Sequence, residues 1–184
     1  QYEGAIGWII GEPNQGLRAM FTMMNNARLG VGGQGIGVAE AAFQHSTDYA
    51  LSRKQGKATI ANGSGTIIDH ADIRRLLISM RADIFASRAL ELENAKAIDM
   101  ANATGDVEWV NRAAFLTPIT KVFGTEVGIN ISHLGVQIHG GMGFIEETGA
   151  AQFSRDVRVT AIYEGTNGIQ AMDLVGRKMM DNGE

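Results

Sequence analysis

The pattern of apolar and polar positions predicts helix along most of the chain. Between residues 17 and 54, apolar side chains recur every three or four positions, the period of one helix face. They are Leu17, Met20, Phe21, Met24, Ile36, Ala39, Phe43 and Ala50. Gly56 follows this stretch as a stop signal. A second stretch begins with Asp69 and Asp72, whose charge suits a helix N-terminus, and continues to about Ala103.

A third helix is predicted over residues 107–138, and we expect Pro118 to bend it. Shorter helices are predicted over residues 152–161 and 167–180. Three long and two short amphipathic helices with short connections predict an all-α fold, an antiparallel up-down helical bundle over residues 13–184.

The first twelve residues differ from the rest. They mix aromatic and β-branched residues with glycine, as a strand does, and a turn around Pro13 separates them from the first helix. A lone strand has no hydrogen-bonding partner. We therefore expect residues 1–12 to be the tail of a β domain missing from this chain, and the chain to be a fragment whose C-terminus is also truncated.

Composition narrows the function classes. The chain has 184 residues, 45% of them hydrophobic and 20% charged, which is ordinary for one globular domain. The absence of cysteine excludes disulfides and thiolate chemistry. A formal charge of -4 makes nucleic acid an unlikely partner. The sequence shows no signal peptide and no uninterrupted apolar span, so we expect a cytoplasmic protein without membrane association.

Residues 30–35 (GVGGQG) match the dinucleotide-binding pattern G-x-G-x-x-G. That pattern needs a strand before it, whereas these glycines lie inside a predicted helix. We instead expect Gly30, Gly33 and Gly37 to share one helix face that admits another backbone or a ligand.

Histidines and charge clusters give weaker signals. The four histidines lack metal-ligand spacing, so no metal site is expected. Residues 155–158 (RDVR) could guide the following loop through ion pairs, but a solvated helix face is the favoured interpretation.

Glu164 is the candidate for chemistry that the residues themselves single out. It lies between an apolar aromatic run and a Gly-Thr-Asn-Gly turn. A carboxylate in apolar surroundings is more basic, which suits a general base. The same residues would also fit a loop that merely enters a helix.

Four motifs, in order, resemble the C-terminal half of acyl-CoA dehydrogenases. They are residues 48–57 (DYALSRKQGK), 137–144 (QIHGGMGF), 155–158 (RDVR) and 162–166 (IYEGT), preceded by Arg28 and a small-residue helix. The resemblance covers essentially the whole chain. Many members carry Arg-x-x-Phe-Gly where this chain has Arg53-Lys54-Gln55-Gly56. In this shorter form the chain resembles the longer bacterial branch of the family. That branch includes methylthiopropanoyl-CoA dehydrogenase-like and alkylation-response-like members.

The resemblance implies a flavoenzyme that converts acyl-CoA thioesters to trans-2-enoyl-CoA. Glu164 would remove the α-proton while the β-hydrogen leaves as hydride to FAD. The backbone N–H of Glu164 and a flavin ribityl hydroxyl would stabilise the developing enolate. Gly165 would leave room for the thioester, and Arg28 would lie near the acyl-CoA site, behind either the glutamate or the CoA moiety.

The resemblance also implies the cofactor contacts and partners. Thr166 and Asn167 would lie beside the FAD diphosphate. Arg53, Gln137 and Gly141 would meet the ADP half of FAD in a neighbouring subunit of a homodimer or homotetramer. For these three, helix-end roles are the alternative. Electron-transferring flavoprotein would accept the electrons. An acyl-CoA oxidase, or a binding and oligomerisation module of the same fold, stays open as an alternative function.

Overall fold

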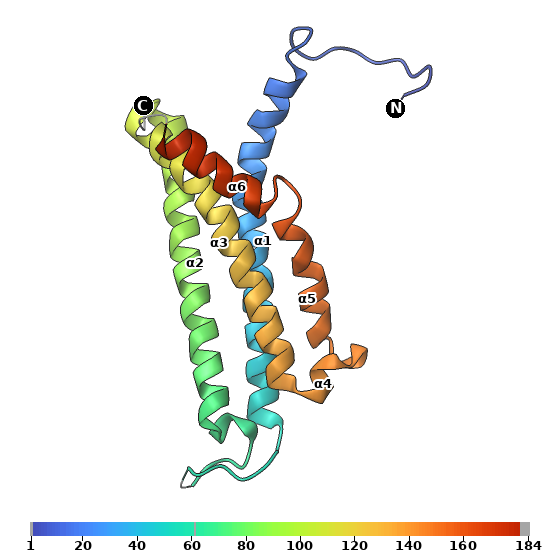
Figure 1. Ribbon diagram of the computed structural model, residues 1–184, viewed down its shortest axis with the longest axis vertical. Coiled ribbons are helices and arrows are strands. Elements are labelled where there is room, and N and C mark those ends of the chain that lie inside the picture. Colours follow the sequence, from blue (N-terminus) through green and yellow to red (C-terminus); the bar gives the residue numbers. More distant parts are fainter. Residues whose placement is uncertain (1, 61, 181–184) are drawn as a thin grey trace.

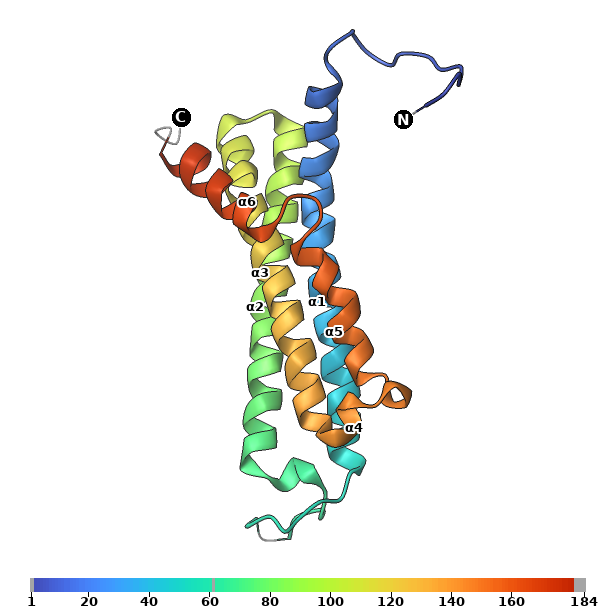
Figure 2. The same ribbon diagram turned by 45° about the vertical axis from the view of Figure 1, so that its right-hand side comes forward.

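Three long helices form the body of the molecule (Figure 1). The computed structural model describes residues 2–60 and 62–180. The long helices are α1 (Gly16–Ser52), α2 (Ala71–Thr104) and α3 (Val107–His139). Helices α1 and α3 run in the same direction side by side, and α2 runs antiparallel to both (Figures 1 and 2). The predicted all-α bundle is confirmed.

Shorter elements cover one side and one end of this body. Helix α5 (Ala150–Arg158) packs along α3 and α1, and α6 (Asn167–Asp173) packs on α3 (Figure 2). A π-helix over Leu174–Met179 continues α6. The remaining elements are α4 (Gly141–Phe144) and 3₁₀ turns at Ile67–Asp69, Glu146–Thr148 and Val159–Ala161. All five predicted helical stretches are therefore present, whereas α4 and the turn after it were not predicted.

Local sequence explains where the long helices end. Gly105 adopts a left-handed conformation (φ 66°) that ends α2, as glycine does at many helix C-termini. The Asp106 carboxylate then accepts a hydrogen bond from the backbone N–H of Glu108 (2.9 Å) and caps α3. Pro118 lies inside α3, which continues through it.

The apolar core lies between the three long helices. Its buried members include Ala39, Ala42 and Ala50 of α1, Leu76, Leu77, Met80 and Ile84 of α2, and Val127, Ile131 and Ile138 of α3. The small alanines come from α1, and the large side chains come mostly from α2. Helix α1 therefore lies close to α3.

Glycines bring α1 and α3 into backbone contact. A methyl group added at Gly124 would lie 2.6 Å from the Gly32 carbonyl oxygen, and one added at Gly128 would lie 2.7 Å from that of Gly35. The prediction of a close backbone approach is correct, but Gly32 and Gly35 make it in place of the predicted glycines. A methyl group at Gly30 or Gly37 would meet nothing within 4 Å, because these glycines face outward.

Gly33 also departs from the predicted backbone contact. A methyl group added there would collide with the side chain of Glu91 on α2. The sequence showed that glycines cluster in α1, but which of them face α3 depends on how the two helices are rotated against each other.

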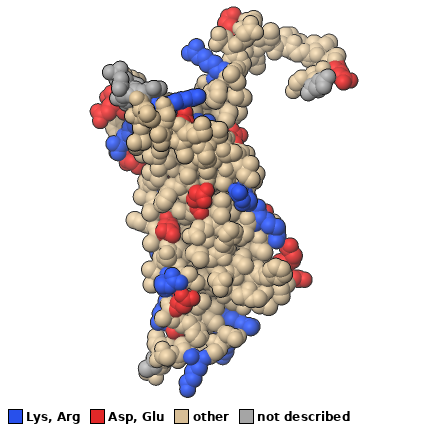
Figure 3. Space-filling view, in the orientation of Figure 1, with Lys and Arg blue, Asp and Glu red and all other residues tan. Residues whose placement is uncertain are grey.

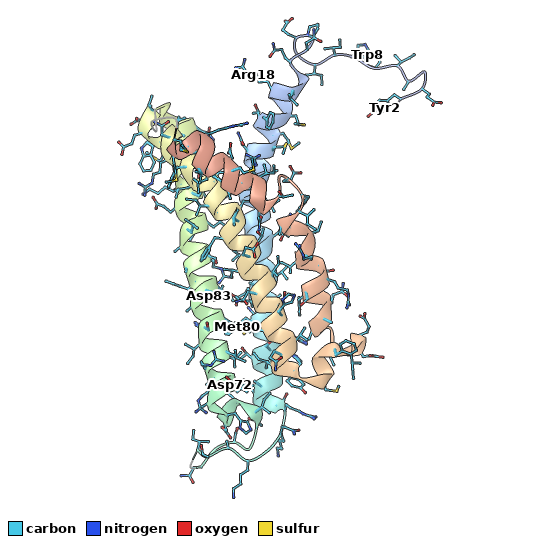
Figure 4. The ribbon with its side chains drawn as sticks, viewed as in Figure 1. Tyr2, Trp8, Arg18, Asp72, Met80 and Asp83 are labelled. Carbon is cyan, nitrogen blue, oxygen red and sulfur yellow. The ribbon has the colours of Figure 1, made fainter. Side chains whose placement is uncertain are left out.

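The segment before α1 forms no strand in the described residues 2–15, contrary to the expected N-terminal strand. A strand requires a hydrogen-bonded neighbour, and the helical part of the chain that the structure describes offers none. Tyr2 and Trp8 are about nine-tenths exposed and lie away from the bundle (Figure 4). That residues 1–12 belong to a β domain stays a prediction, and Gln1 lies outside the described residues.

Replacing Gly35 by alanine should destabilise the protein, because the added methyl group would press on the backbone of Gly124. We expect a loss of about 1–3 kcal/mol in the free energy of unfolding, typical of overpacking. Gly37→Ala in the same helix is the control and should raise stability by about 0.5–1 kcal/mol. Denaturant unfolding would measure both, and equal effects would refute the close approach of α1 and α3.

Candidate active site

A short loop between residue 161 and α6 carries the predicted base. Glu164 adopts a left-handed backbone conformation (φ 53°), uncommon for a residue other than glycine, and Gly165 follows with φ 89°. Such conformations cluster at functional sites. The Thr166 side-chain oxygen then accepts a hydrogen bond from the backbone N–H of Ile169 (3.2 Å) and caps α6. The loop therefore has a defined geometry around a half-buried Glu164.

Arg28 holds this loop from α1. Its side-chain Nε donates a hydrogen bond to the Glu164 carbonyl oxygen (3.4 Å), and Nη1 donates one to the side chain of Asn25 (2.9 Å). Arg28 is buried. The structure thus brings together two residues that are 136 positions apart in the sequence and that were both predicted for the site.

A polar cluster beneath the loop centres on Asn167, the first residue of α6. Its Oδ1 accepts from Lys121 Nζ (2.8 Å), and its Nδ2 donates to Glu126 Oε1 (2.6 Å) and Thr125 Oγ1 (3.1 Å). These contacts turn the Asn167 side chain toward α3. A cofactor contact from Asn167, as predicted, would therefore have to use its backbone.

Lys121 is the main residue that the sequence analysis missed. Its side chain is completely buried in the middle of α3. Burial, and then the nearby positive charge of Arg28, lower the pKa of Lys121 to about 8, while the negative charge of Glu126 opposes the shift. The signal was present in the sequence, because Lys121 lies three and seven positions before the buried Gly124 and Gly128.

Three other predicted residues gather at the opposite end of α3. Arg53 and Gly141 line a cavity of about 500 Å³, together with Tyr49 and His139. Arg53 also ends α1, where its backbone N–H donates to Tyr49 (2.8 Å). Gln137 is exposed nearby, and its carbonyl accepts from the backbone N–H of Gly140 (3.1 Å). Arg53 is thus a helix C-cap and Gln137 bonds the cap of α3, whereas that cap is Gly140 and Gly141 begins α4.

His139 forms an aromatic stack beside this cavity. Its ring lies 4.2 Å from that of Tyr49 and 4.8 Å from that of His45. Nδ1 lies 2.7 Å from the Gly135 carbonyl oxygen, so it carries the proton, and Nε2 has no partner among the described residues. Burial lowers the pKa of His139, and the Gly135 hydrogen bond opposes this shift. A neutral His139 therefore leaves one buried acceptor.

Two further cavities border Arg28 at the α6 end. One, of about 620 Å³, lies between α1, α2 and α3 and is also lined by Thr117 and Asp173. The other, of about 610 Å³, is lined by Phe21 and Met172. Glu164 lines none of these three cavities. None of these three cavities therefore encloses the glutamate.

The remaining sequence signals have structural explanations. The GVGGQG segment lies inside α1, so it is not a strand-to-helix phosphate loop. Arg155 pairs with Glu146 (2.6 Å) on an exposed face, as the favoured interpretation of residues 155–158 held. Among residues 2–60 and 62–180, no three His, Asp or Glu side chains are grouped to hold a metal ion.

Charges are mixed on the face shown in Figure 3, where acidic and basic side chains alternate with broad uncharged areas. A nucleic-acid-binding face would present clustered lysine and arginine. Of the helices in the described parts of the chain, none has the length and apolar character needed to cross a membrane.

Comparison with known proteins decides the family. The family model for the C-terminal domain of acyl-CoA dehydrogenase matches residues 14–180. The chain belongs to the acyl-CoA dehydrogenase family. The 3-methylmercaptopropionyl-CoA dehydrogenase of Ruegeria pomeroyi is 47% identical over 188 residues, covering 100% of this chain and 32% of the relative. This confirms both the family and the branch predicted from the sequence.

Other acyl-CoA dehydrogenases agree with this assignment. A butyryl-CoA dehydrogenase of Syntrophomonas wolfei is 34% identical, covering 99% of this chain and 32% of the relative. The structure of butyryl-CoA dehydrogenase from Megasphaera elsdenii superimposes with a TM-score of 0.74 at 29% identity, covering 90% of this chain and 39% of that one. The chain thus spans about a third of the length of its curated relatives.

Gly165→Ala should disturb the loop of this acyl-CoA dehydrogenase domain. The added methyl group would lie 2.5 Å from the side-chain nitrogen of the buried Gln170, at a φ that alanine disfavours. We expect a loss of about 1–3 kcal/mol in the free energy of unfolding. Gly168→Ala, whose methyl group would have only Thr166 within 4 Å, should leave stability nearly unchanged. Thermal unfolding of both variants would test this, and a neutral Gly165→Ala would contradict it.

Lys121 should make stability depend on pH in alkaline solution. Its pKa is about 8 in the folded protein and returns to about 10.5 on unfolding. Between these values the unfolded chain binds one more proton, so the Lys121 contribution to the free energy of unfolding rises with pH. Denaturant unfolding across this range should show a rise that Lys121→Met reduces. A rise of the same size in both proteins would contradict the assignment.

Proposed function

We propose that this chain is the catalytic-base domain of an FAD-dependent acyl-CoA dehydrogenase. The observation that carries the proposal is Glu164, held in a left-handed loop whose carbonyl is bound by the buried Arg28. A general base must be presented in a fixed orientation to the proton that it removes. The family assignment supports the type of reaction, and the conformation of the loop supports Glu164 as its base.

Glu164 takes the α-proton of an acyl-CoA thioester in this proposal. The Cα–H electron pair moves toward the thioester carbonyl and then forms the Cα–Cβ double bond as the β-hydrogen leaves with its two electrons. FAD, when bound, accepts that hydride. The product is a trans-2-enoyl-CoA, and the proton stays on Glu164 until it is released.

The loop also offers donors for the negative charge that develops on the thioester oxygen. Among the described residues, the backbone N–H of Glu164 donates a hydrogen bond to no acceptor. An unpaired N–H fixed beside the base can stabilise an enolate without reorganisation. Gly165 leaves the space next to this N–H without a side chain, which suits a flat thioester.

The residues at the far end of α3 fit the nucleotide half of FAD. Arg53 offers a guanidinium suited to phosphate, and the buried acceptor of His139 lies beside the same cavity. About 500 Å³ lies within the usual range for small-molecule sites. Arg53, Gln137 and Gly141 would hold that part of the cofactor, while Thr166 and the backbone of Asn167 would approach the diphosphate at the other end.

The separation of these two groups favours an oligomer. Lys121 and Gln137 are sixteen residues apart on one continuous helix, which corresponds to roughly 24 Å. We propose that the two ends serve two FAD molecules in a homodimer or homotetramer. Electron-transferring flavoprotein would then reoxidise the reduced cofactor, as the family resemblance implies.

The substrate is proposed to be a short acyl-CoA. The relative with 47% identity is named for 3-methylmercaptopropionyl-CoA, and the one with 34% identity for butyryl-CoA. Both are thioesters with a hydrogen on the α and β carbons, as the reaction requires.

Anaerobic mixing of the FAD-containing, full-length protein with 3-methylmercaptopropionyl-CoA and butyryl-CoA should bleach the flavin absorbance. Glu164→Gln keeps the size of the side chain and removes the base, so we expect the bleaching rate to fall by at least about 100-fold. Stopped-flow absorbance would measure it.

Glu108→Gln is the matched control, because it changes an exposed carboxylate in the first turn of α3, thirteen residues before Lys121, that contacts neither the loop nor Asn167. Bleaching that survives in Glu164→Gln would refute the proposed base. Rapid reoxidation by oxygen would instead identify an acyl-CoA oxidase, and a protein that no thioester bleaches would be a binding module of the same fold.

A further inference from the structure

Lys121 is a fully buried lysine without a carboxylate partner. Its side chain has no exposed surface, and no Asp or Glu oxygen of the described residues lies within 4.0 Å of its ammonium group. Lysine is almost never fully buried unless it is paired. The lowered pKa of Lys121, about 8, reflects the same desolvation. Its presence therefore calls for an explanation other than fold stability.

Stability alone would favour an apolar side chain at this position. Replacing a buried charge by a hydrophobic residue of similar size is often neutral or stabilising. Methionine has nearly the length of lysine and would fill the same space in α3. The feature that methionine could not reproduce is the hydrogen bond from Nζ to Asn167 Oδ1 (2.8 Å).

Asn167 links Lys121 to the loop that carries Glu164. Its side chain uses both the oxygen and the nitrogen within the protein, with Lys121, Thr125 and Glu126 as partners. It lies three residues after Glu164 and is the first residue of α6. Whatever fixes Asn167 fixes one end of the segment 164–167.

Arg28 fixes the other end of that segment. It binds the Glu164 carbonyl from α1, while Lys121 binds Asn167 from α3. Gly165, between these two attachment points, has a positive φ and no side chain to anchor it. The segment that carries Glu164 is thus held at both ends by buried cations on two different helices.

We infer that Lys121 is a positioning residue for Glu164, acting through its hydrogen bond to Asn167. This inference rests on the proposed function, in which Glu164 is the base. Lys121 touches neither substrate nor flavin in this role. It holds the start of α6 so that the carboxylate meets the α-proton in the reactive orientation.

The test uses the FAD-containing, full-length protein and three variants, Lys121→Met, Asn167→Leu and the double variant. Stopped-flow bleaching at several butyryl-CoA concentrations would separate the limiting rate of flavin reduction from the thioester Kd. We expect each single variant to lower the limiting rate by about 10- to 100-fold, because small misplacement of a reacting group has this effect. The Kd and the FAD content should change by less than about threefold, since only orientation is lost.

The double variant decides whether Lys121 acts through Asn167. If it does, removing both residues should slow flavin reduction no more than the worse single change. Thr120→Val is the control, because Thr120 is a buried neighbour on α3 whose hydroxyl, among residues 2–60 and 62–180, bonds only to the Leu116 carbonyl in the same helix. It should keep the wild-type rate.

Several results would overturn the inference. These are a wild-type rate in Lys121→Met, a loss confined to Kd or FAD content, or single effects that multiply in the double variant. If Lys121→Met does not fold, Asn167→Leu carries the test, and its wild-type rate would be a refutation. Glu164→Gln, measured alongside, separates the two proposals: if it blocks bleaching while Lys121→Met does not, only the role of Lys121 falls.

Discussion

The backbone contact between α1 and α3 is the constraint on which the site depends. Gly32 and Gly35 face Gly124 and Gly128, so the two helices lie closer than side chains would permit. Arg28 precedes Gly32 by four residues, and Lys121 precedes Gly124 by three. The contact therefore aims both cations at the same region, because residues three or four positions apart share a helix face.

This arrangement lowers the stability of the fold and fixes the position of the loop that carries Glu164. Glycine inside a helix costs about 1 kcal/mol relative to alanine, and a buried lysine must give up its hydration. Both unfavourable features occur next to the loop that carries Glu164, whereas the apolar core of large side chains lies farther along the bundle. Unfavourable local choices of this kind are expected where function requires them.

The two ends of α3 have different chemistry. The α6 end has buried cations, polar side chains and a strained loop, while the far end has an aromatic stack, an exposed arginine and glycines. A long, continuous helix keeps the two regions at a fixed distance. The two regions are thus placed for two separate contacts, which the proposed function assigns to two FAD molecules.

The sequence by itself determined the helical class, the five helical stretches and the family, because periodicity, helix-end residues and motif order are local signals. It also pointed to Glu164, Gly165 and Arg28. It could not identify the glycines that touch α3, since Gly30 and Gly37 are also placed at helix-face spacing but face solvent, whereas Gly32 and Gly35 face α3.

Only the tertiary structure joined Lys121 to Asn167 and showed that Arg28, placed near the site by the family resemblance, binds the Glu164 carbonyl. Arg28 and Glu164 are 136 positions apart, and Lys121 and Asn167 are 46 positions apart. No local sequence pattern encodes a hydrogen bond over such a separation. The same is true of the Asn167 side chain, which turns toward α3 because its partners lie there. Hydrogen bonds of this range depend on the rotation and separation of packed helices, which the closest backbone contact sets.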